Sequence, residues 1–271
     1  MLSRWRAARL AVVVMTMAAV VSACSGRGPL APEYEYEEDL TIGLDGSATL
    51  VVNASVPALV ALRGLTLNTA LSARADELRS NLRTAYTSAN TRVGRISTWT
   101  RRGRRFVGVH VTVTDIRRIA DVLPLAWSKY DLHEEGDQVV YRQQLSRSPN
   151  PPALPVNGLT GDELVAFRLH LPARIRFQNS RYLEKDESRP ASRGNILTWE
   201  QRLRERLAGK PIAYAEDRTP DVMEARMDRE SILYRTLWLF GIAFAAAMLV
   251  IAGLIWLTMR RGGPAPSDPP R

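Results

Sequence analysis

One apolar segment near the C-terminus restricts the architecture of this chain more than any other feature. The residues from Thr236 to Met259 include no charged side chain. As a helix these 24 residues would cover about 36 Å, at about 1.5 Å per residue. The hydrocarbon core of a bilayer is about 30 Å thick, and Trp238 and Trp256 fall near its two headgroup zones. We therefore predict a transmembrane helix over 236–259; the alternative is a buried core helix.

The first 23 residues have the parts of a bacterial lipoprotein signal peptide. Three arginines precede an uncharged run from Leu10 to Ala23, which is too short to span a membrane as a helix. Small residues then precede Cys24, the only cysteine of the chain. Cys24 is therefore the expected lipid-attachment site, where a diacylglyceryl thioether bearing palmitate-type chains would form the mature N-terminus. Ordinary signal peptidase would instead leave Cys24 as a free thiol.

The two apolar segments together predict the topology. Arg260 and Arg261 follow the C-terminal run at once, and basic flanks of a span favour the cytoplasmic side. We expect a single-pass protein of the cell membrane, lipid-anchored, with its main domain on the extracytoplasmic side. The expected parts are a signal peptide (1–23), a flexible linker (24–32), an extracytoplasmic domain (33–215), a stalk (216–235) continuous with the transmembrane helix (236–259), and a disordered cytoplasmic tail (260–271).

Composition excludes several classes of protein. A single cysteine excludes a disulfide framework. The formal net charge is +9, from 37 Lys and Arg against 28 Asp and Glu, but much of this excess lies in the leader and the tail. The domain between them lacks the strongly basic balance of nucleic-acid-binding proteins, so we expect no nucleic acid partner.

Hairpin signals repeat along the predicted domain. Asp45-Gly46 separates two runs of alternating apolar residues, which is a strong local hairpin pattern. Apolar residues at helical spacing predict a helix over 72–89. The sequence therefore predicts an α+β domain whose mostly antiparallel, hairpin-built sheet is packed by one or two helices. The other expected elements are strands near 34–44, 47–56 (stopped by Pro57), 93–101, 104–114, 128–133, 139–145, 163–171, 174–178, 195–202 and 210–214, a short helix at 116–123, and a mobile polar insert at 181–193.

Arginines crowd one of these predicted turns. Arg101, Arg102, Arg104 and Arg105 flank Gly103. Close to a membrane they could bind anionic lipid headgroups, since each basic residue near such a surface contributes roughly 1 kcal/mol. The alternative is a solvated hairpin tip whose charges protect a sheet edge. The four arginines are the candidate binding residues of the sequence.

One stretch of the chain resembles a known family. It carries the motif Phe167-Arg-Leu-His-Leu-Pro172, then Asn179, then Gly194-Asn-Ile-Leu-Thr-Trp199-Glu200, between a lipobox and a single span. This resembles the LppM-type lipoproteins described in mycobacteria, whose relatives have no known function. The resemblance implies a compact α+β domain at the cell envelope, with lipid or glycolipid binding. The residues alone predict structural roles, with Trp199 as an inward-facing strand residue and Asn195 as a turn residue.

No pattern in the sequence indicates catalysis. Phosphate-cradling loops and the common nucleophile and metalloprotease motifs do not occur. His110 and His170 fall in predicted strands without a carboxylate or cysteine at ligand spacing. We therefore expect no enzyme activity, no metal site and no cofactor. Two functions stay open: a module that binds a lipid or glycolipid, and an adaptor or assembly factor that docks an envelope protein complex.

Overall fold

The computed structural model describes residues 33–126, 128–147, 151–184, 187–190, 194–212 and 222–261. The predicted signal peptide, Cys24 and the predicted linker lie outside the described residues, as does the sequence from residue 262. The described elements are, in chain order, β1 (Tyr34–Ile42), β2 (Ala48–Ser55), α2 (Val56–Arg63), α3 (Ala75–Tyr86), β3 (Thr91–Arg101), β4 (Arg104–Val113), η1 (Ile116–Asp121), η2 (Leu123–Leu125), β5 (Ser128–Glu135), β6 (Gln138–Leu145), β7 (Leu164–His170), β8 (Ala173–Gln178), β9 (Arg181–Glu184), β10 (Glu187–Pro190), β11 (Ile196–Arg202), α4 (Leu203–Leu207), β12 (Val222–Ser231) and α5 (Ile232–Arg261).

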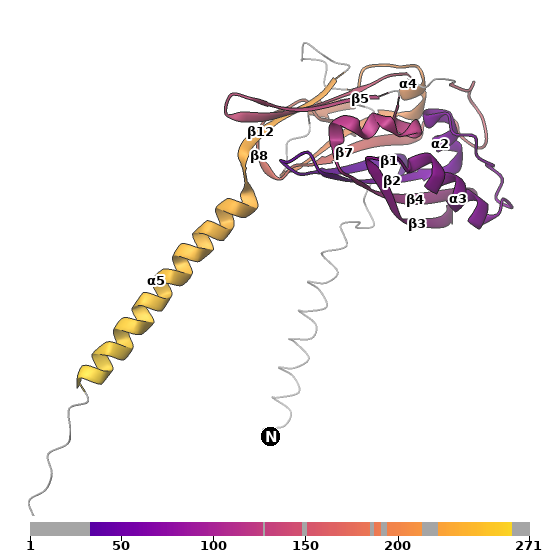
Figure 1. Ribbon diagram of the computed structural model, residues 1–271. Coiled ribbons are helices and arrows are strands. Elements are labelled where there is room, and N and C mark those ends of the chain that lie inside the picture. The colour runs from indigo at the N-terminus through magenta and orange to yellow at the C-terminus, as the bar shows by residue number, and fades with distance from the viewer. Residues whose placement is uncertain are drawn as a thin grey trace, which may run out of the picture. The chain divides into compact units, whose positions relative to one another are not determined.

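The strands form two sheets, which confirms the predicted α+β class with mostly antiparallel strands (Figure 1). The eight-stranded sheet has the order β10-β9-β11-β7-β1-β2-β4-β3, and the four-stranded sheet has the order β5-β6-β12-β8. Two pairings are parallel, β1 with β7 and β9 with β11. The pairing of β1 with β7 joins the first and second halves of the domain at the centre of the larger sheet.

The Asp45-Gly46 hairpin forms as predicted, but with another turn. Gly46 has φ of +88° and is the one residue of this turn in the left-handed region. The Asp45 carboxylate instead accepts hydrogen bonds from the Ser47 backbone N–H (3.0 Å) and hydroxyl (2.7 Å). A further bond runs from the Gly43 N–H to the Ser47 carbonyl (2.7 Å). The loop is therefore longer than a two-residue turn, and β1 ends at Ile42 instead of near Leu44.

Helix α2 is a correction to the expectation that Pro57 only ends a strand. Ser55 closes β2 and caps the helix, because its hydroxyl accepts from the Ala58 N–H (3.1 Å). Pro57 occupies the first turn of the helix, where its missing N–H has no helical partner to lose. Gly64 ends the helix in the left-handed conformation. Strand and helix therefore follow each other without a loop.

The remaining predicted elements up to His170 form with small changes of boundary. The predicted helix over 72–89 is present as the shorter α3, which buries Leu78, Leu82 and Tyr86. The second and third hairpins are confirmed as β3–β4 and β5–β6. The predicted helix at 116–123 is the 3-10 turn η1, and Pro124 lies inside a second one, η2, rather than ending the first.

Two expectations in the second half are wrong. The polar insert at 181–193 contains the antiparallel pair β9–β10 at the edge of the larger sheet. Charged residues are common in exposed edge strands. The polar composition of this segment was therefore compatible with a strand pair as well as with a loop. No strand is present at 210–212, where the last short strand was expected; residues 213–214 lie outside the described part.

The predicted helical stalk at 216–235 is instead largely a strand. Its described part forms β12, and the long helix begins at Ile232 instead of near Pro220. Met223, Ala225 and Met227 are buried in the core while Glu224 and Arg226 alternate with them. This period of two is typical of a strand with one buried face, although Ala, Met, Glu and Arg all favour helices. Because β12 lies between β6 and β8, the domain extends to Ser231 and does not end at residue 215.

A buried ion pair lies in the core. Apolar residues of both sheets, α2 and α3 form a single cluster, and within it Arg63 pairs with Glu38, with side chains that are 0% and 5% exposed. The Arg63 Nε also donates to the Tyr36 hydroxyl at 2.6 Å. Burial raises the pKa of the nearby Tyr86 to about 12, although the Arg63 charge opposes this rise. A buried charge is strongly destabilising without a partner of opposite charge, so each residue of this pair depends on the other.

The motif residues Asn179 and Trp199 connect strands β11 and β12. Trp199 of β11 is 1% exposed, and its indole Nε1 donates to the carbonyl oxygen (3.0 Å) and to Oδ1 (3.2 Å) of Asn179. The Asn179 amide continues to β12, donating to the Val222 carbonyl (2.8 Å) and accepting from the Glu224 N–H (2.9 Å). Trp199 is therefore an inward strand residue, as predicted, and Asn179 links the two sheets.

Candidate functional site

The predicted candidate arginines lie in the β3–β4 turn, and three of them hold neighbouring segments. Arg104 is ion-paired with Glu35 (2.8 Å) and donates to the Gly158 carbonyl (2.6 Å). The other contacts are those of Arg101 with the Tyr34 carbonyl and the Phe106 ring, and of Arg105 with the Leu71 and Ala73 carbonyls. Arg102 is exposed at the tip, with φ of +50°. These contacts position the hairpin, and headgroup binding by the turn stays a prediction.

The histidines do not form a metal centre with one another. His170 lies beside Asp39 (2.9 Å) on the larger sheet, and His133 lies beside Asp131 (2.8 Å) at the end of β5. Within the described ranges, no group of three or more His, Cys, Asp or Glu side chains could hold a metal ion.

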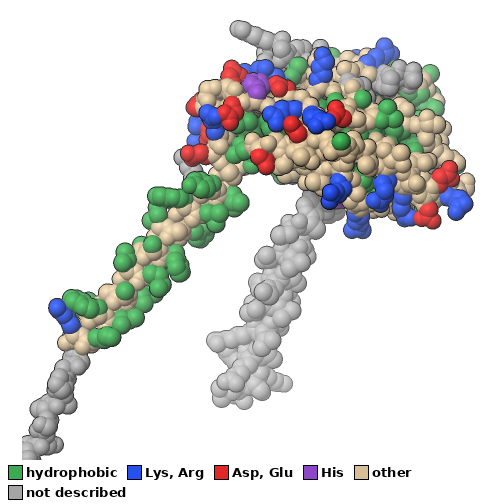
Figure 2. All heavy atoms as spheres, in the orientation of Figure 1, with side chains coloured by type: hydrophobic (Ala, Val, Ile, Leu, Met, Phe, Trp, Pro, Cys, Tyr) green, Lys and Arg blue, Asp and Glu red, His purple; other side chains and the backbone are tan. Residues whose placement is uncertain are grey.

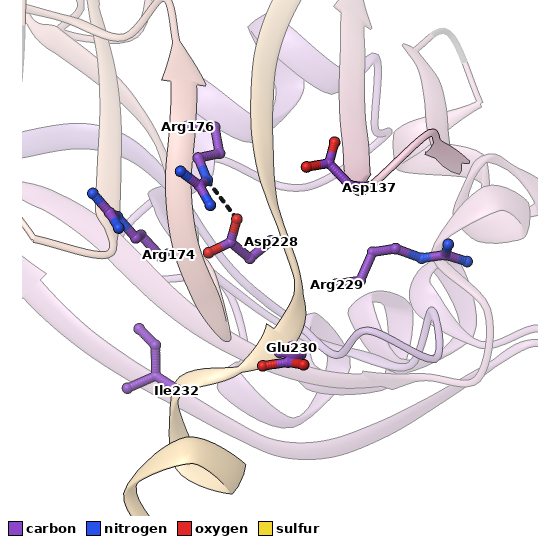
Figure 3. A pocket seen from close by; sticks show the side chains of 7 residues that line it. All are labelled: Asp137, Arg174, Arg176, Asp228, Arg229, Glu230 and Ile232. Carbon is purple, nitrogen blue, oxygen red and sulfur yellow. Dashed lines mark hydrogen bonds and ion pairs between the residues drawn. The ribbon is translucent and has the colours of Figure 1, made fainter.

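A charged cleft lies where the smaller sheet meets helix α5. It has a volume of about 350 Å³. Strand β8, the end of β12, the β5–β6 turn and the first residue of α5 all contribute to it. The lining residues are Asp137, Arg174, Arg176, Asp228, Arg229, Glu230 and Ile232. Figure 3 shows Arg176 and Asp228 pointing toward each other, with Glu230 and Ile232 at the end of β12.

Two arginines of the cleft are held by fold contacts. The Arg176 Nε lies 2.5 Å from Asp228 Oδ1, and this hydrogen bond is the main cause that raises the Arg176 pKa. Asp137 adds to the same shift by its charge. Arg229 pairs with Glu134 and donates to the Gly136 carbonyl (3.2 Å), which ties the β5–β6 turn to the end of β12. The cleft therefore has a preorganised charged wall.

Arg174 and Glu230 have no such contacts. Asp137 also forms no ion pair in the described part of the chain, but its charge acts on Arg176. Arg174 on β8 and Glu230 at the end of β12 are both exposed, and neither forms an ion pair with any residue in the described part of the chain. Both line the same cleft. They supply one strong hydrogen-bond donor group and one acceptor group for a ligand.

The junction between β12 and α5 fixes the position of these residues. The Ile232 N–H, the first of the helix, donates to the Pro172 carbonyl at 3.0 Å. Ser231 is paired with Ala173 of β8, and its hydroxyl accepts from the Leu233 N–H (3.2 Å). The helix start is therefore bonded to the β7–β8 connection, and the cleft lies directly beside it.

Sequence reasoning did not find this cleft. Asp228, Arg229 and Glu230 fall in the segment that was predicted as a stalk, and Arg174 and Arg176 fall in the strand predicted near 174–178. The one usable signal was alternation over 222–228, because a strand there requires sheet partners. No local pattern indicates that those partners are β6 and β8.

Helix α5 is long and apolar enough to cross a membrane. The segment Ile232–Arg260 comprises 29 residues. Its most apolar stretch is not buried against the rest of the protein. Figure 2 shows hydrophobic side chains along the described helix, with basic side chains at its far end. There Arg260 lies over the Trp256 ring at 4.1 Å from its centroid. The span predicted at 236–259 lies wholly inside this helix.

Comparison with known proteins gives a distant structural likeness. No family model matches the sequence, and no curated protein matches it. Among solved structures, the NMR structure of the folded domain of the Mycobacterium tuberculosis LppM protein is similar, with 14% identity and a TM-score of 0.36. The similarity covers 75% of this chain and 95% of that domain. The likeness is distant, so the proposals below rest on the geometry and sequence of this chain.

Proposed function

We propose that this protein is a membrane-anchored envelope module that binds the headgroup of a lipid or glycolipid in the cleft, without catalysis. The observation that carries the proposal is the position of the cleft. Its wall includes Ile232, the first residue of the helix that is long enough to span a membrane. A site that binds lipid headgroups is expected where the domain meets the start of a membrane-spanning helix.

The length of α5 supports this depth. Thirty helical residues cover about 45 Å at about 1.5 Å each, and a bilayer with its headgroup layers is about 40–45 Å thick. Ile232 then lies at the outer edge of a headgroup layer. Thr236, where the uncharged run begins, is about 6 Å deeper along the helix. Charged groups beside Ile232 are thus at the height of lipid phosphates.

The chemistry of the cleft also suits a headgroup better than an acyl chain. Six of the seven lining residues are charged, and Ile232 is the apolar one. Arginine binds phosphate through paired N–H donors. Acyl chains of a lipid seated here could run beside the exposed side chains of α5, where Leu233 is 67% exposed. The site therefore binds the polar part of a lipid and leaves its chains in the bilayer.

Native mass spectrometry tests this function. The full chain is released from its own membrane, exchanged into mild detergent, and examined for lipid that persists at one molecule per protein. Arg174→Gln should reduce the retained lipid. Arg83→Gln, which removes an exposed arginine on α3, is the matched control and should retain it. A wild-type protein without lipid, crosslinked to one envelope protein, would favour the adaptor function instead.

The anchoring and sidedness form part of the same proposal. We infer that Cys24 carries the acyl chains, that the domain is extracytoplasmic and that the tail is cytoplasmic. Mass spectrometry of the mature N-terminus tests the first point, and an unmodified Cys24 would contradict it. Protease added to intact spheroplasts tests the second, because it should remove the domain and leave the tail. Turnover of envelope esters or glycans by the purified protein would contradict a non-catalytic role.

A further inference from the structure

The charge balance of the cleft identifies a class of headgroup. Three arginines line it together with three carboxylates, those of Asp137, Asp228 and Glu230. A site for a purely anionic headgroup is expected to have an excess of cations, because each basic residue near an anionic lipid surface contributes roughly 1 kcal/mol. This cleft has no such excess. We propose that it binds a zwitterionic headgroup with a phosphate and a primary ammonium, the chemistry of phosphoethanolamine. This inference rests on the proposed function.

The uncommitted side chains match the two charges of that headgroup. Arg176 is paired with Asp228, and Arg229 is held by Glu134 and the Gly136 carbonyl. Arg174 is the cation of the wall that has no ion pair among the described residues. Glu230 and Asp137 are the carboxylates without one, and the charge of Asp137 already acts on Arg176. Arg174 is placed to bind the phosphate in a charge-assisted, two-point contact. Glu230 is placed to accept hydrogen bonds from the ammonium.

The lining also distinguishes a primary ammonium from a quaternary one. Choline has no N–H donor, and proteins that recognise it surround it with aromatic rings. None of the seven described lining residues is aromatic. A carboxylate, by contrast, gains charge-assisted hydrogen bonds only from an ammonium that carries protons. The cleft therefore favours phosphatidylethanolamine over phosphatidylcholine at equal headgroup charge.

Competition among defined lipids tests the assignment. The full chain is reconstituted in vesicles of equimolar phosphatidylethanolamine, phosphatidylcholine and phosphatidylglycerol, extracted, and examined by native mass spectrometry for the lipid that survives detergent exchange. We expect phosphatidylethanolamine to be enriched. Arg174→Gln and Glu230→Gln should each reduce its retention about tenfold, the effect of losing one hydrogen bond to a charged group. Glu230→Gln should in addition raise the share of phosphatidylglycerol, because it removes a negative charge.

Matched variants and distinct outcomes make the test decisive. Arg83→Gln and Glu77→Gln change the same charges at exposed positions of α3 and should leave the lipid profile unchanged. Equal retention of phosphatidylglycerol or phosphatidylcholine, or a Glu230→Gln protein with the wild-type profile, would overturn the headgroup assignment while leaving headgroup binding intact. Loss of all lipid from the wild-type protein would overturn the proposed function itself. Thermal unfolding of each variant in detergent excludes misfolding as the cause.

Discussion

The side chain of Asn179 accepts a hydrogen bond from the indole Nε1 of Trp199 at 3.2 Å, and the same side chain is bonded to the backbone of β12. One buried amide therefore connects β11 of the larger sheet with a central strand of the smaller one. The two residues are 20 positions apart in the sequence, and the charged β9–β10 hairpin lies between them. Their contact gives these two motif residues a structural role.

Removing this amide should destabilise the fold. We expect Asn179→Ala to lower the free energy of unfolding by about 2–4 kcal/mol, because the Val222 carbonyl and the Glu224 N–H lose their side-chain partner and buried polar groups without partners are costly. Chemical denaturation of the full chain in detergent, followed by tryptophan fluorescence, measures this. Asn81→Ala on the exposed side of α3 is the control. An equal stability of both variants would contradict the linking role.

The boundary of the domain can be tested with two fragments. Residues 33–231 include β12, whereas residues 33–215 lack it and leave β6 and β8 without the strand between them. We expect the longer fragment to unfold cooperatively and to give a dispersed NMR spectrum. The shorter one should aggregate or remain partly unfolded, because Met223, Ala225 and Met227 leave the core. A well-folded 33–215 fragment would contradict this boundary.

The buried pair of Arg63 and Glu38 should be sensitive to loss of one partner. Glu38→Gln leaves the fully buried Arg63 without its counter-charge, and we expect a loss of about 3–5 kcal/mol in the free energy of unfolding. The double variant Glu38→Leu with Arg63→Met should recover most of this loss, because it removes both charges. Denaturant titrations of the single and double variants measure the coupling. Additive effects of the two changes would show that the pair does not interact.

Acid should weaken the smaller sheet. Burial would raise the pKa of Glu224, but hydrogen bonds from Arg142 (2.9 Å) and Arg226 (2.7 Å) outweigh it and lower the pKa below the usual 4.5. A lowered folded-state pKa stabilises the fold fully above the unfolded pKa, and this stability is lost as the pH falls through the folded value. The melting temperature should therefore fall as the pH drops below about 4.5.

A variant assigns this pH dependence to Glu224. Glu224→Gln should lower the melting temperature at pH 7 and flatten its decline in acid, since the titrating carboxylate is gone. Glu77→Gln, at an exposed position of α3, should keep the wild-type profile. Differential scanning calorimetry between pH 3 and pH 7 measures both. An unchanged slope for Glu224→Gln would assign the acid sensitivity to other carboxylates.

Local patterns predicted the elements whose stability is local. The hairpins around Gly46, Gly103 and Gly136 form because a turn and the alternation on both sides belong to one stretch of chain. Local signals misled where two patterns compete. Pro57 was expected to end a strand, but it lies in the first turn of helix α2. Strand β12 is composed of residues that favour helices, but its apolar residues alternate as in a strand. For the candidate site, the sequence indicated the arginines around Gly103, which stay a prediction, and gave no signal for the cleft beside α5.

The apolar span, the hairpin order and the α+β class can be predicted from the sequence alone, because the length of an uncharged run and the period of apolar residues are properties of neighbouring residues. The parallel pairing of β1 with β7 and the position of β12 between β6 and β8 are visible only in the folded protein. The position of β12 in the smaller sheet brings together Asp137, Arg174 and Glu230, which are widely separated in the chain. Such contacts depend on which remote strands bury each other's apolar faces, and an alternating pattern states that a strand needs a partner without saying which one.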